Sequence, residues 1–341
     1  MNYLSNNFAS SVITWQEKFG RHNLPWQQAG AYATWISEIM LQQTQVVTVI
    51  DYFNQFMLRF PSIQALAAAN IDEVLASWSG LGYYARARNI HKTAQILISE
   101  HHHNLPKTIE ALVKLPGIGP STAGAIMALG HHDYGVILDG NVKRILSRCF
   151  GVYVDGQSTY AQKLLWQISH YVTPKDQCDV YTQGIMDLGA GICHKHQPQC
   201  PQCPLNTICY AYTHHVTGYL PLKKPKKSKP NLEKHMVIFL YNGLIGLQKN
   251  PDQGIWGGLW TPQILDKAPQ GLDLIRVYNT IKHVFTHQTW HIKPLVVHGN
   301  HPDIKHWFSI QDALQLGLPK PVRDIIEIIA HDKLNLLQET K

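Results

Sequence analysis

A segment rich in lysine and proline, PLKKPKKSKP at residues 221–230, divides the sequence into two regions of different texture. It contains five lysines, three prolines and no acidic residue. Such a segment cannot bury a core, and repulsion among its like charges keeps it extended. The chain of 341 residues is therefore expected to form two domains, at 1–212 and 232–341, joined by a basic linker at 213–231.

The two regions have different hydrophobic periods. In the first, apolar residues recur three and four positions apart, which predicts helices over 8–115 and from Ser121 to about Ala190. In the second, MVIFLYNGLIGLQ (236–248) predicts two strands around the turn residues Asn242-Gly243. The strings VYNTIKHVFTH and WHIKPLVVH also predict strands, and PVRDIIEIIAHDKLNLL predicts an amphipathic helix. An all-helical region is therefore expected before a smaller α+β domain.

Composition narrows the class of protein. Hydrophobic residues make up 45% of the chain and charged residues 16%, which excludes a disordered chain. The net charge of +7 favours a polyanionic partner. No apolar run reaches the length of a membrane span, and the N-terminus lacks the features of a signal peptide. A cytoplasmic protein without a membrane partner is expected, and its six cysteines are not expected to form disulfides.

Four of the cysteines form a compact pattern, C-x6-C-x2-C-x5-C, at Cys193, Cys200, Cys203 and Cys209. Four thiolates so close in sequence can surround one metal centre, and both zinc and a [4Fe–4S] cluster accept four cysteines. Zinc usually takes paired C-x2-C knuckles, and only one such pair is present. The spacing favours iron and leaves zinc open. The loop between the first two cysteines, HKHQPQ, is basic and suits a phosphate backbone.

A second motif, LPGIGPSTAGAIMA at 115–128, places two glycines before a helical run. Gly117 and Gly119 allow a tight turn with exposed amides, and the helix that follows adds free N–H groups. Together they can hold a DNA phosphate without reading a base. An ordinary helix–turn–helix is the alternative.

Two carboxylates have sequence environments suited to acid–base chemistry. Glu38 lies among Ile36, Ile39 and Met40, and desolvation there would raise its pKa from about 4.3 toward about 6–7. Asp139 precedes the helical string GNVKR, where an N-cap is its simplest role. Taken alone, a glutamate such as Glu38 is more often a solvated helix residue.

Six strings together resemble the MutY family of adenine DNA glycosylases, within the helix-hairpin-helix superfamily. They occur in family order: SEIMLQQTQV, GLGYYARARN, LPGIGPSTAGAI, LDGNVKR, MDLGA and the four-cysteine loop. The resemblance is strong over 8–212 and extends more weakly through WGGLW (256–260) and HVFTH (283–287). It implies an all-α helix-hairpin-helix glycosylase region with an iron–sulfur cluster loop, followed by a smaller α+β Nudix-like domain.

The resemblance also implies a reaction and its residues. The family removes adenine mispaired with 8-oxoguanine or guanine from double-stranded DNA, and a monomer is expected. Glu38 and Asp139 fall on the catalytic carboxylates, and the four cysteines fall on the ligands of a [4Fe–4S] cluster. The remaining matched positions are expected to contact the extruded adenine or the DNA: Gln42, Gln43, Tyr83, Gly117, Gly119, Ser121, Asn141 and Gln183.

The implied mechanism begins with extrusion of the adenine nucleotide, because the glycosidic bond cannot be reached inside the stack. Glu38 then protonates adenine at N7, and Asp139 stabilises the oxocarbenium-like sugar. The nearest alternative, the endonuclease III type of the same superfamily, carries a lysine at the Ser121 position that attacks the sugar. A serine hydroxyl cannot form a Schiff base, so a monofunctional glycosylase is expected.

The C-terminal region resembles the Nudix fold but lacks the run of metal-binding glutamates that nucleotide hydrolysis requires. It is therefore expected to read a base rather than to hydrolyse a nucleotide. The resemblance implies that it recognises 8-oxoguanine through Phe285, Thr286 and His287, where the family has Phe-Ser-His. A strand end with a buried Phe is the structural alternative. Two other classes, a mismatch-sensing protein without chemistry and a redox regulator, leave the paired carboxylates and the glycosylase strings unexplained.

Overall fold

The computed structural model describes residues 2–154, 158–222 and 228–339, so the centre of the predicted linker lies outside the described residues. The chain divides into two compact units, which are described separately. Unit 1 consists of Met1–Ala65 and Lys92–Pro225, and unit 2 of Leu66–His91 and Lys226–Lys341. No helix among the described residues has the length and apolar character needed to cross a membrane.

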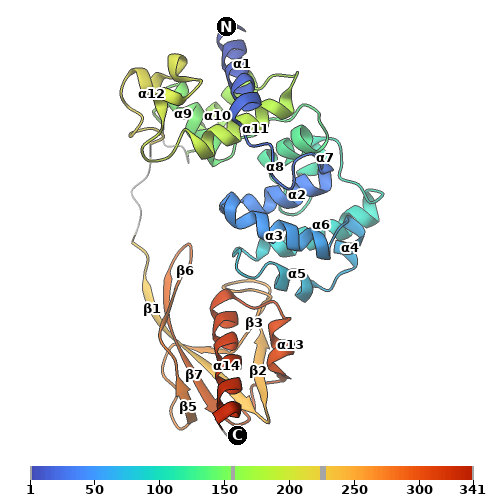
Figure 1. The fold of residues 1–341 in the computed structure, drawn as a ribbon, viewed down its shortest axis with the longest axis vertical. Helices are drawn as coiled ribbons and strands as arrows, with labels where there is room; N and C mark the ends of the chain where they lie inside the picture. Colours follow the sequence, from blue (N-terminus) through green and yellow to red (C-terminus); the bar gives the residue numbers. More distant parts are fainter. Residues whose placement is uncertain (1, 155–157, 223–227, 340–341) are drawn as a thin grey trace. The chain divides into compact units, whose positions relative to one another are not determined.

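Unit 1 is helical, as the sequence predicts (Figure 1). Its core is formed mainly by α1 (Asn2–Phe19), α9 (Gly140–Cys149), α10 (Thr159–Val172) and α11 (Cys178–Gly191). Val12, Leu146, Leu165 and Ile185 are fully buried there. The chain enters unit 2 through α4 and returns through α6. The helices that lie wholly or partly in unit 1 are α1 (Asn2–Phe19), α2 (Gly30–Leu41), α3 (Val46–Arg59), α4 (Ile63–Ala68), α6 (Ala85–Glu100), α7 (Ile109–Leu112), α8 (Pro120–Ala125), the π-helix η1 (Ile126–Gly130), α9 (Gly140–Cys149), α10 (Thr159–Val172), α11 (Cys178–Gly191), the 3-10 helices η2 (Cys200–Gln202) and η3 (Asn206–Ile208), and α12 (Tyr210–Thr213).

The predicted hairpin connects α7 to α8. Thr108 caps α7 by accepting a hydrogen bond from Ala111 N at 3.3 Å. Gly117 has φ of +80°, a conformation that favours glycine. A Cβ on Gly124 would lie 2.0 Å from the carbonyl oxygen of Val136. This close approach sets the extended segment before Asp139 directly against α8.

Unit 2 contains a mixed sheet with the strand order β3-β2-β1-β7-β5. The predicted hairpin is confirmed: β1 pairs antiparallel with β2 across Asn242 and Gly243, which both have positive φ. Strands β1 and β7 pair in parallel from Asn231 opposite Thr289 to Leu240 opposite His298. The elements are β1 (Asn231–Tyr241), β2 (Leu244–Lys249), β3 (Trp260–Thr261), β4 (Gln263–Leu265), β5 (Asp273–Val277), β6 (Ile281–Val284), β7 (Thr289–His298), β8 (His306–Phe308), α13 (Ile310–Leu314) and α14 (Lys320–Glu339).

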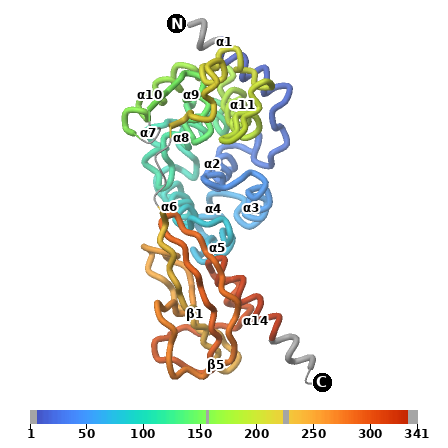
Figure 2. The backbone as a smooth tube through the Cα atoms, turned by 90° about the vertical axis from the view of Figure 1, so that its left-hand side faces the viewer, coloured from blue at the N-terminus to red at the C-terminus, as the bar shows by residue number. Residues whose placement is uncertain are grey.

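The predicted C-terminal helix is α14, and it runs beside the strands in both views (Figure 1, Figure 2). It buries Val322, Ile325, Ile326 and Ile329, which lie three and four residues apart on one face. On β1 and β7, Val237, Phe239 and Val297 form a small core with Ile304. The strand-rich character expected beyond residue 231 is therefore confirmed.

The helical segment 66–91 packs with the C-terminal residues in unit 2. It contains α5 (Ile71–Ser77), whose N-terminus carries a complete capping box between Asn70 and Glu73. The Asp72 carboxylate accepts hydrogen bonds from Lys249 Nζ at 3.0 Å and Trp260 Nε1 at 3.2 Å. Residues 66–91 thus belong to unit 2, although they fall within the predicted domain 1–212. The domain boundaries stay a prediction.

Candidate active site

Glu38 lies on α2, where Ile36, Ile39 and Met40 are buried around it. Burial raises the pKa of its carboxyl to about 8, and the nearby charge of Asp139 contributes to the rise. The direction expected from the sequence is confirmed. Glu38 is therefore protonated at neutral pH, as a general acid must be.

Asp139 is the N-cap of α9 and accepts a hydrogen bond from Val142 N at 2.7 Å. Burial raises the pKa of Asp139, while the Val142 N–H and the Arg144 guanidinium oppose the rise. The simplest role expected from the sequence, an N-cap, is therefore present. The same carboxylate also lies near enough to Glu38 for its charge to act there, so α2 and the start of α9 form one carboxylate pair.

Ser121 fixes the chain that leads into this pair. Its Oγ accepts a hydrogen bond from Leu138 N at 3.0 Å, directly before Asp139. Ser121 follows the exposed turn formed by Gly117 and Gly119. Space around Gly119 is open, since a Cβ there would meet no atom within 4 Å.

Asn141 and Gln42 each form a side-chain hydrogen bond. Arg144, which the sequence analysis did not single out, donates to Asn141 Oδ1 at 2.8 Å and to the Cys193 carbonyl at 2.7 Å. Gln42 follows the last turn of α2 and donates to Thr122 Oγ1 at 3.3 Å. Gln43 is exposed, with φ of +62°.

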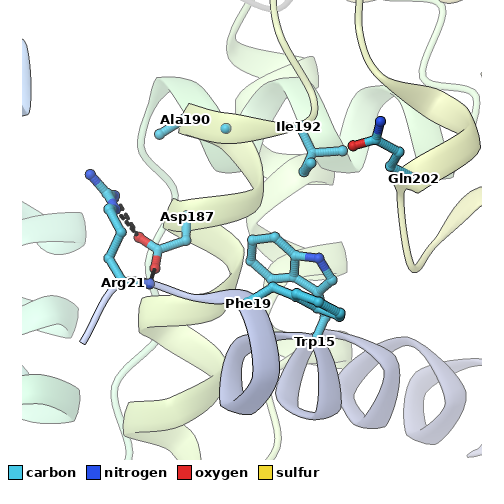
Figure 3. Close-up of a pocket in the computed structure, with 8 residues that line it drawn as sticks. Trp15, Phe19, Arg21, Asp187, Ala190, Ile192 and Gln202 are labelled. Carbon is cyan, nitrogen blue, oxygen red and sulfur yellow. Dashed lines mark hydrogen bonds and ion pairs between the residues drawn. The ribbon is translucent and has the colours of Figure 1, made fainter.

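Gln183 lies on α11 and is 8% exposed. Its Nε2 donates to Asp187 Oδ1 at 2.8 Å. Asp187 in turn accepts hydrogen bonds from Arg21, whose Nε lies 2.8 Å from Oδ1 and whose backbone N lies 2.7 Å from Oδ2 (Figure 3). Sequence reasoning missed Asp187 and Arg21, although MDLGA contains the first of them.

A cavity of about 630 Å³ opens beside Arg21 and Asp187 (Figure 3). Its walls also include Trp15, Phe19 and Ile192, at the ends of α1 and α11. Neither Glu38 nor Asp139 lines it, so the cavity is distinct from the carboxylate pair.

The four predicted ligand cysteines line one common cavity in unit 1: Cys193, Cys200, Cys203 and Cys209. The buried Arg148 guanidinium lies 3.2 Å from Cys193 Sγ. Cys149, a fifth thiol, donates a hydrogen bond that lowers the pKa of Cys209 to about 6. No three His, Cys, Asp or Glu side chains of the described residues converge closely enough to hold a single metal ion.

Tyr83 belongs to unit 2 and is 48% exposed on a left-handed backbone, with φ of +49°. The Arg86 guanidinium lies over its ring at 5.5 Å. Two neighbours hold the same turn on the C-terminal residues: Ser79 Oγ donates to the Leu318 carbonyl at 2.9 Å, and Tyr84 Oη donates to the same oxygen at 3.1 Å. The turn that carries Tyr83 is thus part of unit 2 rather than a free loop.

Phe285, Thr286 and His287 form the turn between β6 and β7. Phe285 is half-buried, and its ring lies 4.9 Å from Trp290 and 5.7 Å from Trp256. Phe285 N donates to the Gln288 carbonyl at 2.8 Å and closes the turn. Thr286 and His287 are both exposed. Phe285 therefore anchors the turn by packing, and its two neighbours face solvent.

Two protein-family models match separate parts of this chain, and curated relatives match most of it. Residues 36–169 match the model of the HhH-GPD superfamily base excision DNA repair protein, and residues 235–328 match the NUDIX domain. An adenine DNA glycosylase of Buchnera aphidicola subsp. Baizongia pistaciae is 39% identical over 94% of this chain and 95% of its own. An adenine DNA glycosylase of Mus musculus is 38% identical over 62% of this chain and 43% of its own.

Solved structures support the fold of the helical part. A thermostable thymine-DNA glycosylase is 25% identical, with a TM-score of 0.57 over 62% of this chain and 98% of its own. An endonuclease III in a non-covalent DNA complex is 18% identical, with a TM-score of 0.54 over 63% of this chain and 98% of its own. The second likeness shows the fold alone.

Proposed function

Because the chain belongs to the adenine DNA glycosylase family, we propose that it excises adenine mispaired with 8-oxoguanine or guanine in double-stranded DNA. One observation carries the catalytic assignment: a carboxyl with its pKa raised to about 8, Glu38, lies beside a second carboxylate, Asp139. One carboxyl that gives a proton and a second that stabilises the developing positive charge are what hydrolysis of a glycosidic bond requires.

The chemistry divides between the two groups. The Glu38 proton passes to adenine N7, and the C1′–N9 bond breaks with its electron pair leaving on the base. The Asp139 carboxylate stabilises the positive charge that develops on the sugar, while the Val142 N–H holds its orientation at 2.7 Å. Water then adds to C1′ and gives its proton to the Glu38 carboxylate, which restores the acid.

The DNA contacts proposed for unit 1 surround this pair. The exposed glycines of the hairpin, Gly117 and Gly119, would approach a phosphate through their backbone amides. Open space at Gly119 supports this role, because a side chain there would occupy the approach. Gln42, Gln43 and Asn141 would contact the nucleotides around the extruded adenine.

Ser121 supports a monofunctional reaction. Its hydroxyl accepts the Leu138 N–H at 3.0 Å and so positions the backbone beside Asp139. It carries no amine that could attack the sugar, so strand cleavage through a Schiff base has no nucleophile at this position.

The four cysteines that line one cavity fit a [4Fe–4S] cluster. All four donors are thiols, and the Arg148 guanidinium at 3.2 Å from Cys193 offsets the negative charge that thiolate ligands bring. When bound, the cluster would hold residues 193–209 in one conformation and present the basic loop HKHQPQ to the DNA backbone. Zinc is the alternative that metal analysis would distinguish.

The C-terminal unit is the proposed reader of 8-oxoguanine. Thr286 and His287 are exposed at the end of a turn whose base is packed by Phe285 and Trp290. Exposed polar side chains on a packed turn suit recognition, because they can contact a base without rearrangement of the sheet. Tyr83, from the same unit, is proposed to enter the duplex near the mismatch.

The function is tested with a duplex that contains one adenine opposite 8-oxoguanine, followed by alkali. Strand cleavage at the adenine is expected only after alkali, because a monofunctional glycosylase leaves an abasic site. Cleavage before alkali would contradict the monofunctional assignment, and an intact strand after alkali would contradict the activity on this mispair.

A further inference from the structure

A chain of hydrogen bonds links Gln183, Asp187 and Arg21, and its first two members are buried. Gln183 and Asp187 lie one turn apart on α11 and are 8% and 3% exposed. Gln183 Nε2 donates to Asp187 Oδ1 at 2.8 Å. Arg21 holds the same carboxylate from its backbone N at 2.7 Å and its Nε at 2.8 Å (Figure 3). Oδ1 of Asp187 therefore accepts from both the Arg21 guanidinium and the Gln183 amide, while Oδ2 accepts from the Arg21 backbone.

The direction of the Gln183 amide follows from the chemistry of its partner. An ionised carboxylate only accepts hydrogen bonds, whereas an amide has a donating NH₂ end and an accepting carbonyl end. The reverse orientation of Gln183 would set its carbonyl oxygen against the Asp187 oxygen, and both atoms are acceptors. The amide nitrogen must therefore face Asp187, which leaves Oε1 as the end available to a ligand.

We infer that Asp187, held in place by Arg21, determines base specificity by orienting Gln183. With the nitrogen engaged, Gln183 offers a carbonyl oxygen, which accepts from the exocyclic amino group of adenine. A purine with a carbonyl at C6, such as guanine or hypoxanthine, would present an acceptor to an acceptor. This inference rests on the proposed function and on the expectation from the family resemblance that Gln183 contacts the extruded adenine. Asp187 and Arg21 are positioning residues and do not touch the substrate.

The test compares two duplexes that differ only in the target base, adenine or hypoxanthine, opposite the same 8-oxoguanine. Asp187→Asn gives Gln183 a partner that can donate, so either orientation of its amide is satisfied. Under single-turnover conditions, the ratio of adenine to hypoxanthine excision is expected to fall by about tenfold or more, the scale of one buried hydrogen bond. A merely structural role would lower both rates together and leave the ratio unchanged.

A matched control lies on the same helix. Asp179 is an acidic residue in the first turn of α11, and its side chain is 38% exposed beside His132 at 3.1 Å. Asp179→Asn makes the same chemical change without touching Gln183. It is expected to keep the wild-type ratio of adenine to hypoxanthine excision.

A double variant restores the acceptor by a different route. Gln183→Glu combined with Asp187→Asn keeps the charge of the pair, and a carboxylate at 183 accepts in every orientation while the asparagine amide donates to it. Adenine preference is expected to return toward the wild-type ratio. This rescue separates an effect on polarity from general damage to α11.

Each outcome decides between the alternatives. A folded Asp187→Asn protein with the wild-type ratio overturns the inference, as does an equal loss on both bases that the double variant does not restore. If Asp187→Asn does not fold, the folded double variant decides: retained adenine preference supports the inference, and its loss overturns it. A wild-type protein that excises no adenine would instead refute the proposed function.

Discussion

The carboxylate pair and the 285–287 turn show two ways to hold functional side chains. Glu38 and Asp139 are fixed by buried helices, a helix cap and the burial that raises the Glu38 pKa to about 8. Thr286 and His287 are exposed, and only Phe285 beneath them is packed. The first region is built for chemistry at fixed geometry, whereas the second leaves its polar groups open to a partner. Substitutions in the two regions should therefore differ in size and in kind.

The largest difference is expected at the acid. Glu38→Gln keeps the shape of the side chain but removes the proton, and general acid catalysis is worth about 10²–10⁴-fold. Single-turnover excision should fall by at least that factor while mismatch binding persists. Glu17→Gln, at an exposed position on α1, is the control and should keep the wild-type rate. A Glu38→Gln enzyme with nearly normal single-turnover rates would remove Glu38 from the mechanism.

Loss of a ligand cysteine should remove a cofactor rather than a catalytic group. Cys203→Ala leaves three of the four predicted ligand thiols in the common cavity. We expect iron content to fall from about four per chain, as one [4Fe–4S] cluster requires, to near zero. Cys178→Ala is the control, since the Cys178 thiol lies against the backbone of Gly135 rather than in that cavity. Colourless wild-type protein with stoichiometric zinc would show that the four cysteines bind zinc rather than iron.

The pH dependence should distinguish the buried site from the exposed turn. Burial raises the pKa of Glu38 to about 8, so the protonated and active form is complete well below pH 8 and is lost as pH rises through it. Excision under kcat/KM conditions should fall by about tenfold per pH unit above that point. A profile that rises through pH 8 would show that Glu38 does not act as the acid.

A smaller and more selective effect is expected at the turn. Thr286→Ala removes one exposed hydroxyl, and a lost hydrogen bond corresponds to about 1–2 kcal/mol, or roughly tenfold in relative affinity. The preference for adenine opposite 8-oxoguanine over adenine opposite guanine should drop by that factor at fixed salt. Thr261→Ala, a buried change on β3, should leave the preference intact even if it lowers stability. An unchanged ratio in Thr286→Ala would assign the turn to packing alone.

The smallest effect concerns stability. Asp72→Asn weakens the hydrogen bonds from Lys249 at 3.0 Å and Trp260 at 3.2 Å. Because the site is partly exposed, we expect a loss of about 1 kcal/mol in the free energy of unfolding. Chemical denaturation monitored by tryptophan fluorescence measures it. A loss well above about 1 kcal/mol would show that unit 2 depends on this contact more than the geometry indicates.

The predictable part of the molecule is the part encoded by local patterns. The Asn242-Gly243 turn, the amphipathic α14 and the apolar surround of Glu38 each follow from neighbouring residues. The hydrogen bond between Arg21 and Asp187 joins positions 166 residues apart, and no local pattern indicates it. The same limit applies to the packing of 66–91 with the C-terminal residues, because it depends on how distant surfaces meet.

The path of the chain between the units also affects how the protein can be dissected. Segment 66–91 is separated in sequence from the rest of unit 2 by residues 92–225, yet Asp72, Ser79 and Tyr84 contact residues beyond 240. A protease that cuts in the linker would sever the only covalent connection there but leave these contacts in place. The two fragments should co-elute on gel filtration. A gene truncated at the linker would expose the face of 66–91 that Leu318 and Trp260 cover, so its product should be less stable than the full chain.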